Sequence, residues 1–354
     1  MTAVLLIAGI VALVAGAELL VRGASRLAVS VGISPLVVGL TVVAFGTSAP
    51  EMAASLRAAL TGNADLALGN VVGSNVFNVL GILGLSALVA PLAVAVRLVR
   101  VDVPIVLGVS LAVVVLAGNG GISRWEGLLL LAFIVGHTVW LVRAARREDR
   151  EAVDVPMAVV TGAAAVTRAT LAVLAGLAAL VVGANWLVEG AVSVASALGV
   201  SERVIGLTLV AIGTSLPELA TSVVAAARGQ RDIAVGNVIG SNLFNLTAVL
   251  GIAAVGSSDG IAVAGRALRV DLPVMVLTAA VCLPVLFTGF EVSRREGLAF
   301  LAAMAAYLGW VVADGTGRGL PVTVTVAVVA FGAAALAATA LESIRQLRRS
   351  DRGG

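Results

Sequence analysis

The chain contains 354 residues, of which 60% are hydrophobic and 12% are charged, and its formal net charge is +3. With a mean hydropathy of +1.11, this composition excludes a soluble globular protein, because one water-soluble core cannot bury so much apolar surface. It predicts a polytopic integral membrane protein. The single cysteine, Cys282, excludes an internal disulfide, and the lone His137 cannot build a transition-metal site by itself, so both are interpreted as packing residues.

Apolar stretches that approach the roughly 20 residues of a spanning helix follow one another along the chain. None shows the period-two alternation of an outer-membrane barrel, so we predict an all-α protein. The first stretch is interpreted as a span and not as a cleaved signal, because no basic residue precedes it and its Gly16-Ala17 pair returns as Gly183-Ala184. The eleven predicted helices cover residues 3–22, 33–59, 66–91, 101–118, 124–143, 168–190, 201–227, 233–256, 271–289, 295–313 and 321–341.

An internal duplication organises these helices. The segment 39–51, GLTVVAFGTSAPE, recurs 167 residues later as GLTLVAIGTSLPE at 206–218, with 10 of 13 positions identical. A second block, GNVVGSNVFN at 69–78, returns at the same offset as GNVIGSNLFN at 236–245. The first five and the next five helices therefore form two repeats, residues 1–143 and 168–313, joined by a linker at 144–167. The helix at 321–341 is an additional C-terminal helix without a partner in the duplication.

The odd number of helices in each repeat predicts how the two repeats are related. After five spans the chain has changed sides, so the second repeat enters the membrane from the side opposite to the first. Equivalent helices are then antiparallel, which gives an inverted-topology repeat with a pseudo-two-fold axis in the membrane plane. This axis is expected to bring segments 39–51 and 206–218 together near the midplane, where transporters of this type bind substrate.

Arginine placement predicts the orientation, since all 23 basic residues are arginine. Most of them fall on one side of the membrane if the N-terminus is outside and the C-terminus inside, as the positive-inside rule requires. We therefore expect a multi-pass protein of the cell inner (plasma) membrane with a cytoplasmic linker and a cytoplasmic C-terminus.

Each copy of the first motif contains a helix-breaking pattern at membrane depth. Pro50 and Pro217 lack an amide hydrogen and clash with the preceding turn, so the carbonyls of Gly46 and Gly213 lose their helical partners. Irregular backbone at this depth is tolerated only where it is buried in protein or lines a polar cavity. We expect local unwinding that exposes backbone carbonyls and the hydroxyls of Thr47, Ser48, Thr214 and Ser215.

The carboxylates of Glu51 and Glu218 indicate what such a cavity holds. An ionised carboxylate near the bilayer centre costs about 2.5 kcal/mol or more, and no arginine lies in the same central stretches. A single intramembrane glutamate could be a protonated structural residue, but two copies beside Gly-Thr-Ser and proline favour a cation site. Hard oxygen ligands suit Ca²⁺ and Na⁺. Further oxygen ligands are expected, one turn apart in the second motif, from Ser74, Asn78, Ser241 and Asn245.

These paired motifs resemble those of the cation/Ca²⁺ antiporter superfamily, specifically the prokaryotic Na⁺/Ca²⁺ exchangers, over residues 1–313. The resemblance implies a ten-helix inverted-repeat core in which the two glutamates and the hydroxyls or carbonyls around them bind the transported ions. It adds the carbonyls of Ala44 and Ala211 to the expected metal ligands. It also implies that helices 3–22 and 168–190 slide across the bundle that bears the ligands. Relatives that use K⁺ carry Asp where this chain has Asn245, which argues against K⁺ cotransport.

The expected function is secondary antiport of Na⁺ against Ca²⁺ by alternating access, with electrogenic Ca²⁺ export, and not enzymatic catalysis. No cofactor is expected. The expected partners are the two ions and the lipid bilayer, with no nucleic acid, and a monomer is compatible with a sequence that leaves the oligomeric state open. Two alternatives stay open: a Ca²⁺/H⁺ antiporter of the same fold and, more distantly, a passive cation channel.

Overall fold

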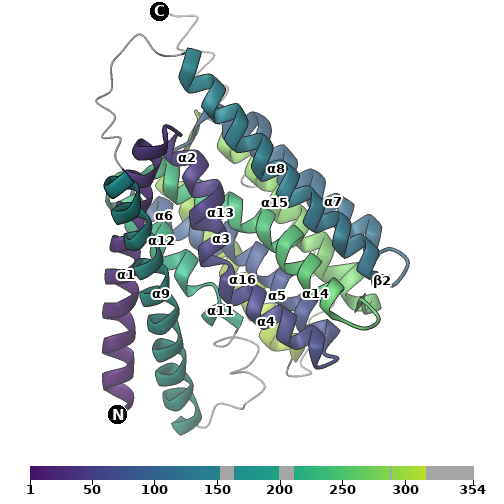
Figure 1. Ribbon diagram of the computed structural model, residues 1–354. Coiled ribbons are helices and arrows are strands. Elements are labelled where there is room, and N and C mark those ends of the chain that lie inside the picture. The colour runs from purple at the N-terminus through teal and green to yellow at the C-terminus, as the bar shows by residue number, and fades with distance from the viewer. Residues whose placement is uncertain (152–162, 199–210, 288, 316–354) are drawn as a thin grey trace, which may run out of the picture.

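The computed structural model describes residues 1–151, 163–198, 211–287 and 289–315. Within these ranges the secondary structure is helical apart from four two-residue strands (Figure 1). Seven helical segments of the described chain are long and apolar enough to cross a membrane, and an eighth is added if the bent pair Pro35–Thr47 and Ala49–Leu60 is one span. The prediction of a helical polytopic membrane protein is confirmed. The predicted helix 321–341 and residues 201–210 of the predicted seventh helix lie outside the described residues.

Helices α1 (Thr2–Val31) and α9 (Ala163–Ala197) pack against each other along much of their length at one side of the bundle (Figure 1). Both are longer than predicted. They are antiparallel, because a Cβ added at Gly9 would meet the backbone of Leu187, whereas one added at Gly176 would lie 2.6 Å from the amide nitrogen of Leu20. Glycines at seven-residue intervals thus allow the two backbones to touch, as small residues do between membrane helices.

A broken helix follows α1. The chain leaves α1 through Gly32, whose φ of 65° forms a left-handed C-cap, and Ser34 caps the next helix by accepting a hydrogen bond from the amide of Val37 at 3.4 Å. This span consists of α2 (Pro35–Val38), the π-helical turn η1 (Gly39–Val43), α3 (Ala44–Thr47) and α4 (Ala49–Leu60). It bends by 44° at Ser48. The predicted break beside Pro50 is confirmed.

The second copy of this motif is described from α11 (Ala211–Gly213) onwards and continues as α12 (Leu216–Ala227). Ser215 separates the two helices with φ −90° and ψ 8°, close to the −77° and 4° of Ser48. Pro217 lies in the first turn of α12, as Pro50 does in α4, so neither proline interrupts a helical hydrogen bond within its own helix.

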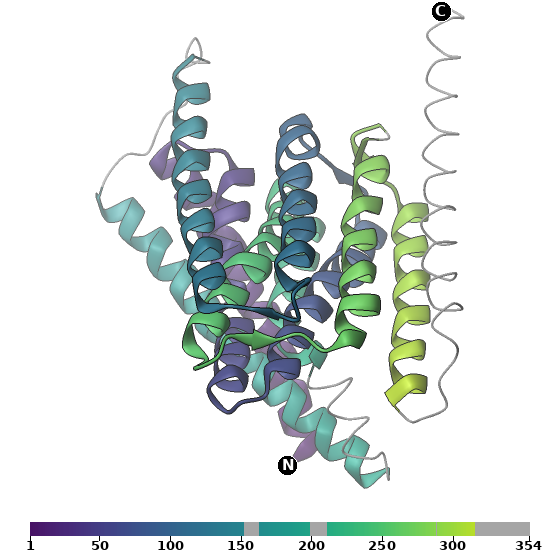
Figure 2. The same cartoon turned by 90° about the vertical axis from the view of Figure 1, so that its right-hand side faces the viewer.

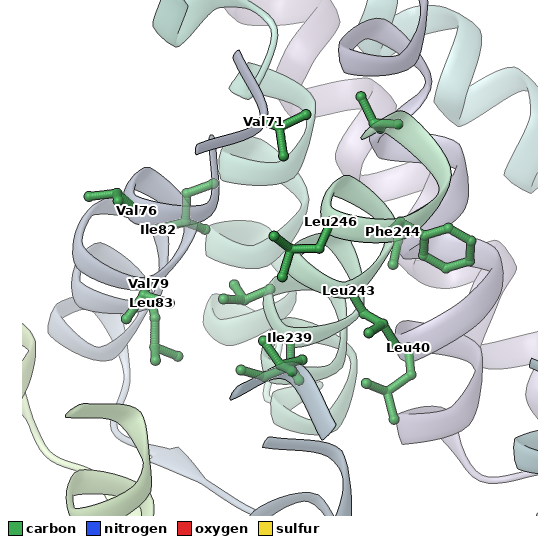
Figure 3. Close-up of a cluster of buried hydrophobic side chains, with 14 of the residues drawn as sticks. Leu40, Val71, Val76, Val79, Ile82, Leu83, Ile239, Leu243, Phe244 and Leu246 are labelled. Carbon is green, nitrogen blue, oxygen red and sulfur yellow. The ribbon is translucent and has the colours of Figure 1, made fainter. Parts of the chain in front are cut away.

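Two helices form the centre of the bundle. One consists of α5 (Ala64–Phe77), η2 (Asn78–Leu83) and α6 (Gly84–Val89), and the other of α13 (Arg231–Phe244), η5 (Asn245–Val249) and α14 (Leu250–Gly256). In their most apolar windows 78% and 89% of residues are buried, against 33% for α1. Figure 3 shows their apolar side chains gathered around this centre, including Val76, Ile82, Ile239 and Leu246. The second sequence motif therefore lies in the most enclosed part of the molecule.

The outer helices are α7 (Val103–Ala117), preceded by η3 (Leu98–Asp102), α8 (Arg124–Glu151), α15 (Leu272–Phe287), preceded by η6 (Ala267–Asp271), and α16 (Arg294–Gly315). Capping boxes begin α8 and α16. Glu126 accepts a hydrogen bond from the amide of Ser123 at 2.7 Å, and Glu296 accepts one from the amide of Ser293 at 2.8 Å. Figure 2 shows α7, α8, α15 and α16 running side by side across the face turned to the viewer.

Four short strands, which the sequence did not suggest, join the two halves of the chain. Strand β1 (Leu92–Ala93) pairs with β4 (Glu291–Val292), and β2 (Gly121–Ile122) pairs with β3 (Ile261–Ala262), both antiparallel. Each pair links a loop of residues 1–143 to a loop of residues 168–313, so the halves are tied together outside the helices as well as within them.

Candidate ion-binding site

The helix breaks place two carboxylates at the middle of the bundle. Glu51 lies in the first turn of α4 and Glu218 in the first turn of α12, each directly after its break. Each is ten residues before the C-cap of its helix. At 1.5 Å per residue this is about 15 Å, half the roughly 30 Å of a hydrocarbon core. Both carboxylates therefore lie deep in the bundle, at equivalent distances from the ends of their helices.

Burial and charge make these two groups unusual. Glu51 is 0% exposed and Glu218 is 1% exposed, and they are close enough to interact electrostatically. Neither buried glutamate forms an ion pair with a described residue, in contrast to Glu18, which pairs with Arg22 and with Arg228. The positive N-terminal end of each helix offsets only part of a full negative charge. A cation is the partner that this environment lacks.

A hydroxyl from one half of the chain binds the carboxylate of the other. Ser215, at the second break, donates a hydrogen bond of 2.8 Å to Oε1 of Glu51, and its hydroxyl is also hydrogen-bonded to that of Ser74 at 3.2 Å. Ser215 and Glu51 are 164 residues apart in the sequence. The two motif copies therefore meet, as the sequence predicted.

The threonine before each break makes an equivalent contact with the opposite half of the chain. Thr47 donates to the side-chain oxygen of Asn237 at 3.0 Å and lies 3.5 Å from the hydroxyl of Ser241. Thr214 donates to the side-chain oxygen of Asn70 at 3.3 Å. Each break is thus tied to the central helix of the opposite half.

Asn70 and Asn237 are candidate site residues that the sequence reasoning missed. The side-chain amide of Asn70 donates to the backbone carbonyl of Glu51 at 3.2 Å and to the hydroxyl of Ser55 at 2.8 Å. Asn237 donates to the backbone carbonyl of Glu218 at 3.3 Å and to a hydroxyl one turn later in α12 at 3.0 Å. These bonds fix the first turn of α4 and α12. Their spacing of four residues before Ser74 and Ser241, on one helix face, was the available signal.

Four further asparagines lie at the boundary between each α-helix and the π-helical turn that follows it. Asn78 donates to the side-chain oxygen of Asn242 at 3.0 Å, across the two halves. Asn75 instead donates to the backbone carbonyl of Val71 at 2.7 Å. Within the described residues, both polar atoms of Asn245 lack a hydrogen-bond partner, although the side chain is 1% exposed. The equivalent amides of Asn78 and Asn245 therefore differ in their hydrogen bonding, although the sequence around them is duplicated.

The two halves of the site also differ in how many of their polar atoms are hydrogen-bonded. In the half around Glu51, one carboxylate oxygen is hydrogen-bonded and the hydroxyl of Ser215 has two partners. In the half around Glu218, both carboxylate oxygens and the hydroxyl of Ser48 are buried without a hydrogen bond to any described residue. The buried oxygens without a hydrogen bond thus lie mainly around Glu218, where a bound ligand would satisfy the largest number of them.

The two expected carbonyl ligands belong to the residues just before the breaks. The carbonyl of Ala44 accepts hydrogen bonds from the amide of Ser48 at 3.0 Å and from the hydroxyl of Thr47 at 3.4 Å. Ala211 is the first residue of α11. Among the ten predicted polar ligands, hydrogen bonds or close contacts join Ser215 to Glu51 and Ser74, and Thr47 to Ser241. Thr214 and Asn78 bond to asparagines outside the predicted set. The side chains of Ser48, Glu218 and Asn245 form no hydrogen bond with a described residue.

The donor set is composed of oxygen atoms. Among the described residues no three His, Cys, Asp or Glu side chains cluster together, so the charge of the site comes from two carboxylates, and hydroxyl, amide and carbonyl oxygens supply the rest. Such a set suits hard cations, with Ca²⁺ taking six to eight oxygen ligands. Soft metals that select thiolate or imidazole are disfavoured.

Comparison with known proteins identifies the family of this arrangement. The family model described as sodium/calcium exchanger protein matches residues 1–143 and 168–313. This chain belongs to that family. The matched segments include both glutamates and both breaks, and they exclude residues 144–167 and the chain after 313. The chain is thus a cation/Ca²⁺ antiporter-like membrane protein, and several of its relatives are named as exchangers.

Individual relatives are similar over most of their length. The chain is 39% identical to the inner membrane protein YrbG of Escherichia coli, over 71% of this chain and 79% of the relative. It is 32% identical to the sodium/calcium exchanger MaX1 of Methanosarcina acetivorans, over 80% of this chain and 90% of the relative. A solved structure of the sodium-calcium exchanger NCX_Mj, soaked with Na⁺ and Ca²⁺, superposes with a TM-score of 0.72 at 30% identity, covering 85% of this chain and 95% of that one.

Proposed function

We propose that the protein exchanges Na⁺ for Ca²⁺ by alternating access at a site built around Glu51 and Glu218. The observation that carries this proposal is the pair of fully buried carboxylates, which interact with each other and pair with no cationic side chain of the described chain. Two such charges strongly disfavour a closed cavity without a cation. Closure over Ca²⁺ or over Na⁺ is allowed, so the two ions exchange and do not leak.

The proposed ligands are the twelve residues expected from the sequence. Carboxylates come from Glu51 and Glu218. The neutral oxygens come from Thr47, Ser48, Thr214, Ser215, Ala44, Ala211, Ser74, Ser241, Asn78 and Asn245. Their support is the hydrogen-bonded cluster around the two breaks and the oxygens left unsatisfied beside Glu218.

The architecture we propose is a ten-helix inverted repeat of residues 1–143 and 168–313, joined by a cytoplasmic linker at 144–167 and followed by an additional helix at 321–341. Exchanged contacts support it. Gly9 contacts Gly183 and Gly16 contacts Gly176, and these glycines are equivalent in the duplicated sequence. Likewise the loop strands pair as β1 with β4 and as β3 with β2, where β1 corresponds to β3 and β2 to β4. A two-fold axis between the repeats produces this exchange.

Coupling to Na⁺ is preferred over coupling to protons because the site contains two ionisable groups and many neutral oxygens. Asn245 supplies an amide where relatives that use K⁺ carry a carboxylate. The names of MaX1 and NCX_Mj as sodium/calcium exchangers support the same choice. We propose electrogenic Ca²⁺ export across an inner (plasma) membrane, with the N-terminus outside and the C-terminus inside. The paired helices α1 and α9 are proposed to slide across the ligand-bearing bundle.

The test is counter-ion-dependent Ca²⁺ flux. Purified protein in liposomes should take up Ca²⁺ when the vesicles are loaded with Na⁺ and should take up little when they are loaded with choline. Uptake driven equally well by an outward proton gradient without Na⁺ would identify a Ca²⁺/H⁺ antiporter. Rapid uptake with no counter-ion at all would identify a passive channel and overturn the proposal.

A further inference from the structure

Two buried hydroxyls beyond the predicted ligand set have no hydrogen-bond partner among the described residues. They belong to Thr221 of α12 and Ser86 of α6, and both side chains are 0% exposed. Other buried hydroxyls on helices behave differently. Thr278 and Ser110, for example, each donate to the carbonyl four residues earlier at 2.8 Å. A buried hydroxyl without a hydrogen bond costs free energy, so Thr221 and Ser86 are unusual positions.

The two hydroxyls lie on neighbouring helices that lead to the same face of the membrane. Helices α6 and α12 pack against each other. The turn after α12 contacts the C-terminal half of α1, through Arg228 with Glu18 at 2.8 Å and Ser25 with Gln230 at 3.3 Å. We call the face that contains this turn and residues 32–34 the α1–α2 face. The span Pro35–Leu60 leads away from this face and the next span, α5 to α6, leads back, so α6 ends on the α1–α2 face.

Both hydroxyls lie between the depth of Glu218 and the ends of their helices. At 1.5 Å per residue, Glu218 lies roughly 15 Å before the end of α12 and Thr221 roughly 10 Å before it, so Thr221 is about one turn nearer to the α1–α2 face. Ser86 lies roughly 6 Å before the end of α6 on the neighbouring helix.

The direction of Thr221 differs from that of the neighbouring hydroxyl. Ser222 binds Asn237 and the carbonyl of Ala234 and therefore faces α13. Thr221 precedes it by one residue and so points about 100° away around the helix. It shares the buried stripe of Glu218 but not the contact with α13, so its hydroxyl is available to a ligand.

Only one of the two repeats carries each of these hydroxyls. The positions equivalent to Thr221 and Ser86 are Ala54 and Ala253, which are also helical but carry no oxygen. The route between Glu51 and the opposite face therefore lacks both hydroxyls. Since the two copies agree at nearly every ligand position, the difference concerns access to the site and not the site itself.

Building on the exchange function proposed above, we infer that Thr221 and Ser86 line the access route of the transported cation between Glu218 and the α1–α2 face. In this conformation the route is closed, because both residues are fully buried. When it opens, each hydroxyl replaces one water of the cation's hydration shell. The opposite route works without these ligands.

The experiment measures the variants Thr221→Val and Ser86→Ala. The matched controls are Thr278→Val and Ser110→Ala, which remove a buried threonine or serine hydroxyl that is hydrogen-bonded within its own helix. Right-side-out and everted membrane vesicles expose opposite faces, and a membrane-impermeant thiol reagent acting on Ser34→Cys identifies the vesicles that expose the α1–α2 face. Na⁺-dependent Ca²⁺ uptake is measured in both as a function of external Ca²⁺.

Thr221→Val should raise the KM for Ca²⁺ about fivefold at the α1–α2 face, the equivalent of about 1 kcal/mol for one lost hydroxyl ligand. At the opposite face KM should stay within twofold, and Ser86→Ala should behave alike. The controls should match wild type at both faces, and Thr221→Ser should restore wild-type KM. An equal rise at both faces, or no rise at either, would overturn the inference. Wild-type vesicles without Na⁺-dependent uptake would instead overturn the proposed function.

Discussion

Neutralising either buried carboxylate tests the site at its most sensitive point. Glu51→Gln and Glu218→Gln each keep the volume of the side chain and remove one negative charge. The carboxylate of Glu218 accepts no hydrogen bond from a described residue, and the carboxylate of Glu51 accepts one from Ser215 that an amide oxygen can also accept. Neither substitution breaks an ion pair of the described chain, so both variants should insert and fold.

The size of the effect follows from burial. At 0% and 1% exposure the carboxylates are shielded from bulk water, and an effective dielectric of about 20 applies. Two unit charges 4 Å apart then interact by about 4 kcal/mol, and a directly coordinated divalent ion interacts more strongly. Since about 1.4 kcal/mol is a factor of ten, Ca²⁺ affinity should fall by at least about a thousandfold.

The assay is Na⁺-dependent ⁴⁵Ca²⁺ uptake into proteoliposomes, with protein amount and monodispersity matched to wild type. Glu296→Gln is the matched control, because Glu296 is a buried carboxylate in the capping box of α16 and glutamine also completes such a box. The control should transport normally and both site variants should not. Transport within tenfold of wild type by either site variant would refute the assignment of the carboxylates.

Three further predictions concern the electrostatics and the packing. Asn245→Asp adds a third carboxylate to the site, so transport should become more dependent on pH and sensitive to K⁺; pH and K⁺ profiles that overlay those of wild type would place this residue outside the coordination shell. An inside-positive potential, set with K⁺ and valinomycin, should accelerate Ca²⁺ uptake into Na⁺-loaded vesicles, because each net charge is driven by about 2.3 kcal/mol per 100 mV; indifference to voltage would mean electroneutral exchange. Gly176→Ala should destabilise the protein by about 1–3 kcal/mol, because its Cβ would lie 2.6 Å from the backbone nitrogen of Leu20. Gly136→Ala, with no neighbour within 4 Å, should not, and equal thermal midpoints for the two variants would argue against close α1–α9 packing.

Features that depend on chain chemistry alone could be predicted from the sequence. The break at Ser48 follows from Pro50, and the enclosure of Glu51 and Glu218 follows from an apolar context without a nearby arginine. The meeting of Ser215 with the opposite carboxylate followed from the duplication and the parity of its helices.

Features that depend on how two helices are set against each other could not be predicted. Asn70 and Asn237 bind the backbone of the glutamates only because α5 and α13 pack at one particular height beside α4 and α12. The unequal hydrogen bonding of Asn78 and Asn245 is likewise a choice between competing partners that the nearly identical repeats do not encode. The length of α1 was missed because its C-terminal end carries polar residues that continue the helix beyond the apolar span.

The central claim is that Na⁺ and Ca²⁺ occupy the same oxygens, and equilibrium competition tests it most directly. Binding of ⁴⁵Ca²⁺ to the purified protein is measured at increasing Na⁺, with ionic strength held constant by choline. The account predicts that Na⁺ raises the apparent Kd for Ca²⁺ progressively, with the number of Ca²⁺ sites unchanged, and that Glu51→Gln and Glu218→Gln show no saturable binding. Ca²⁺ binding that is unaffected by Na⁺, or that persists in both variants, would contradict it.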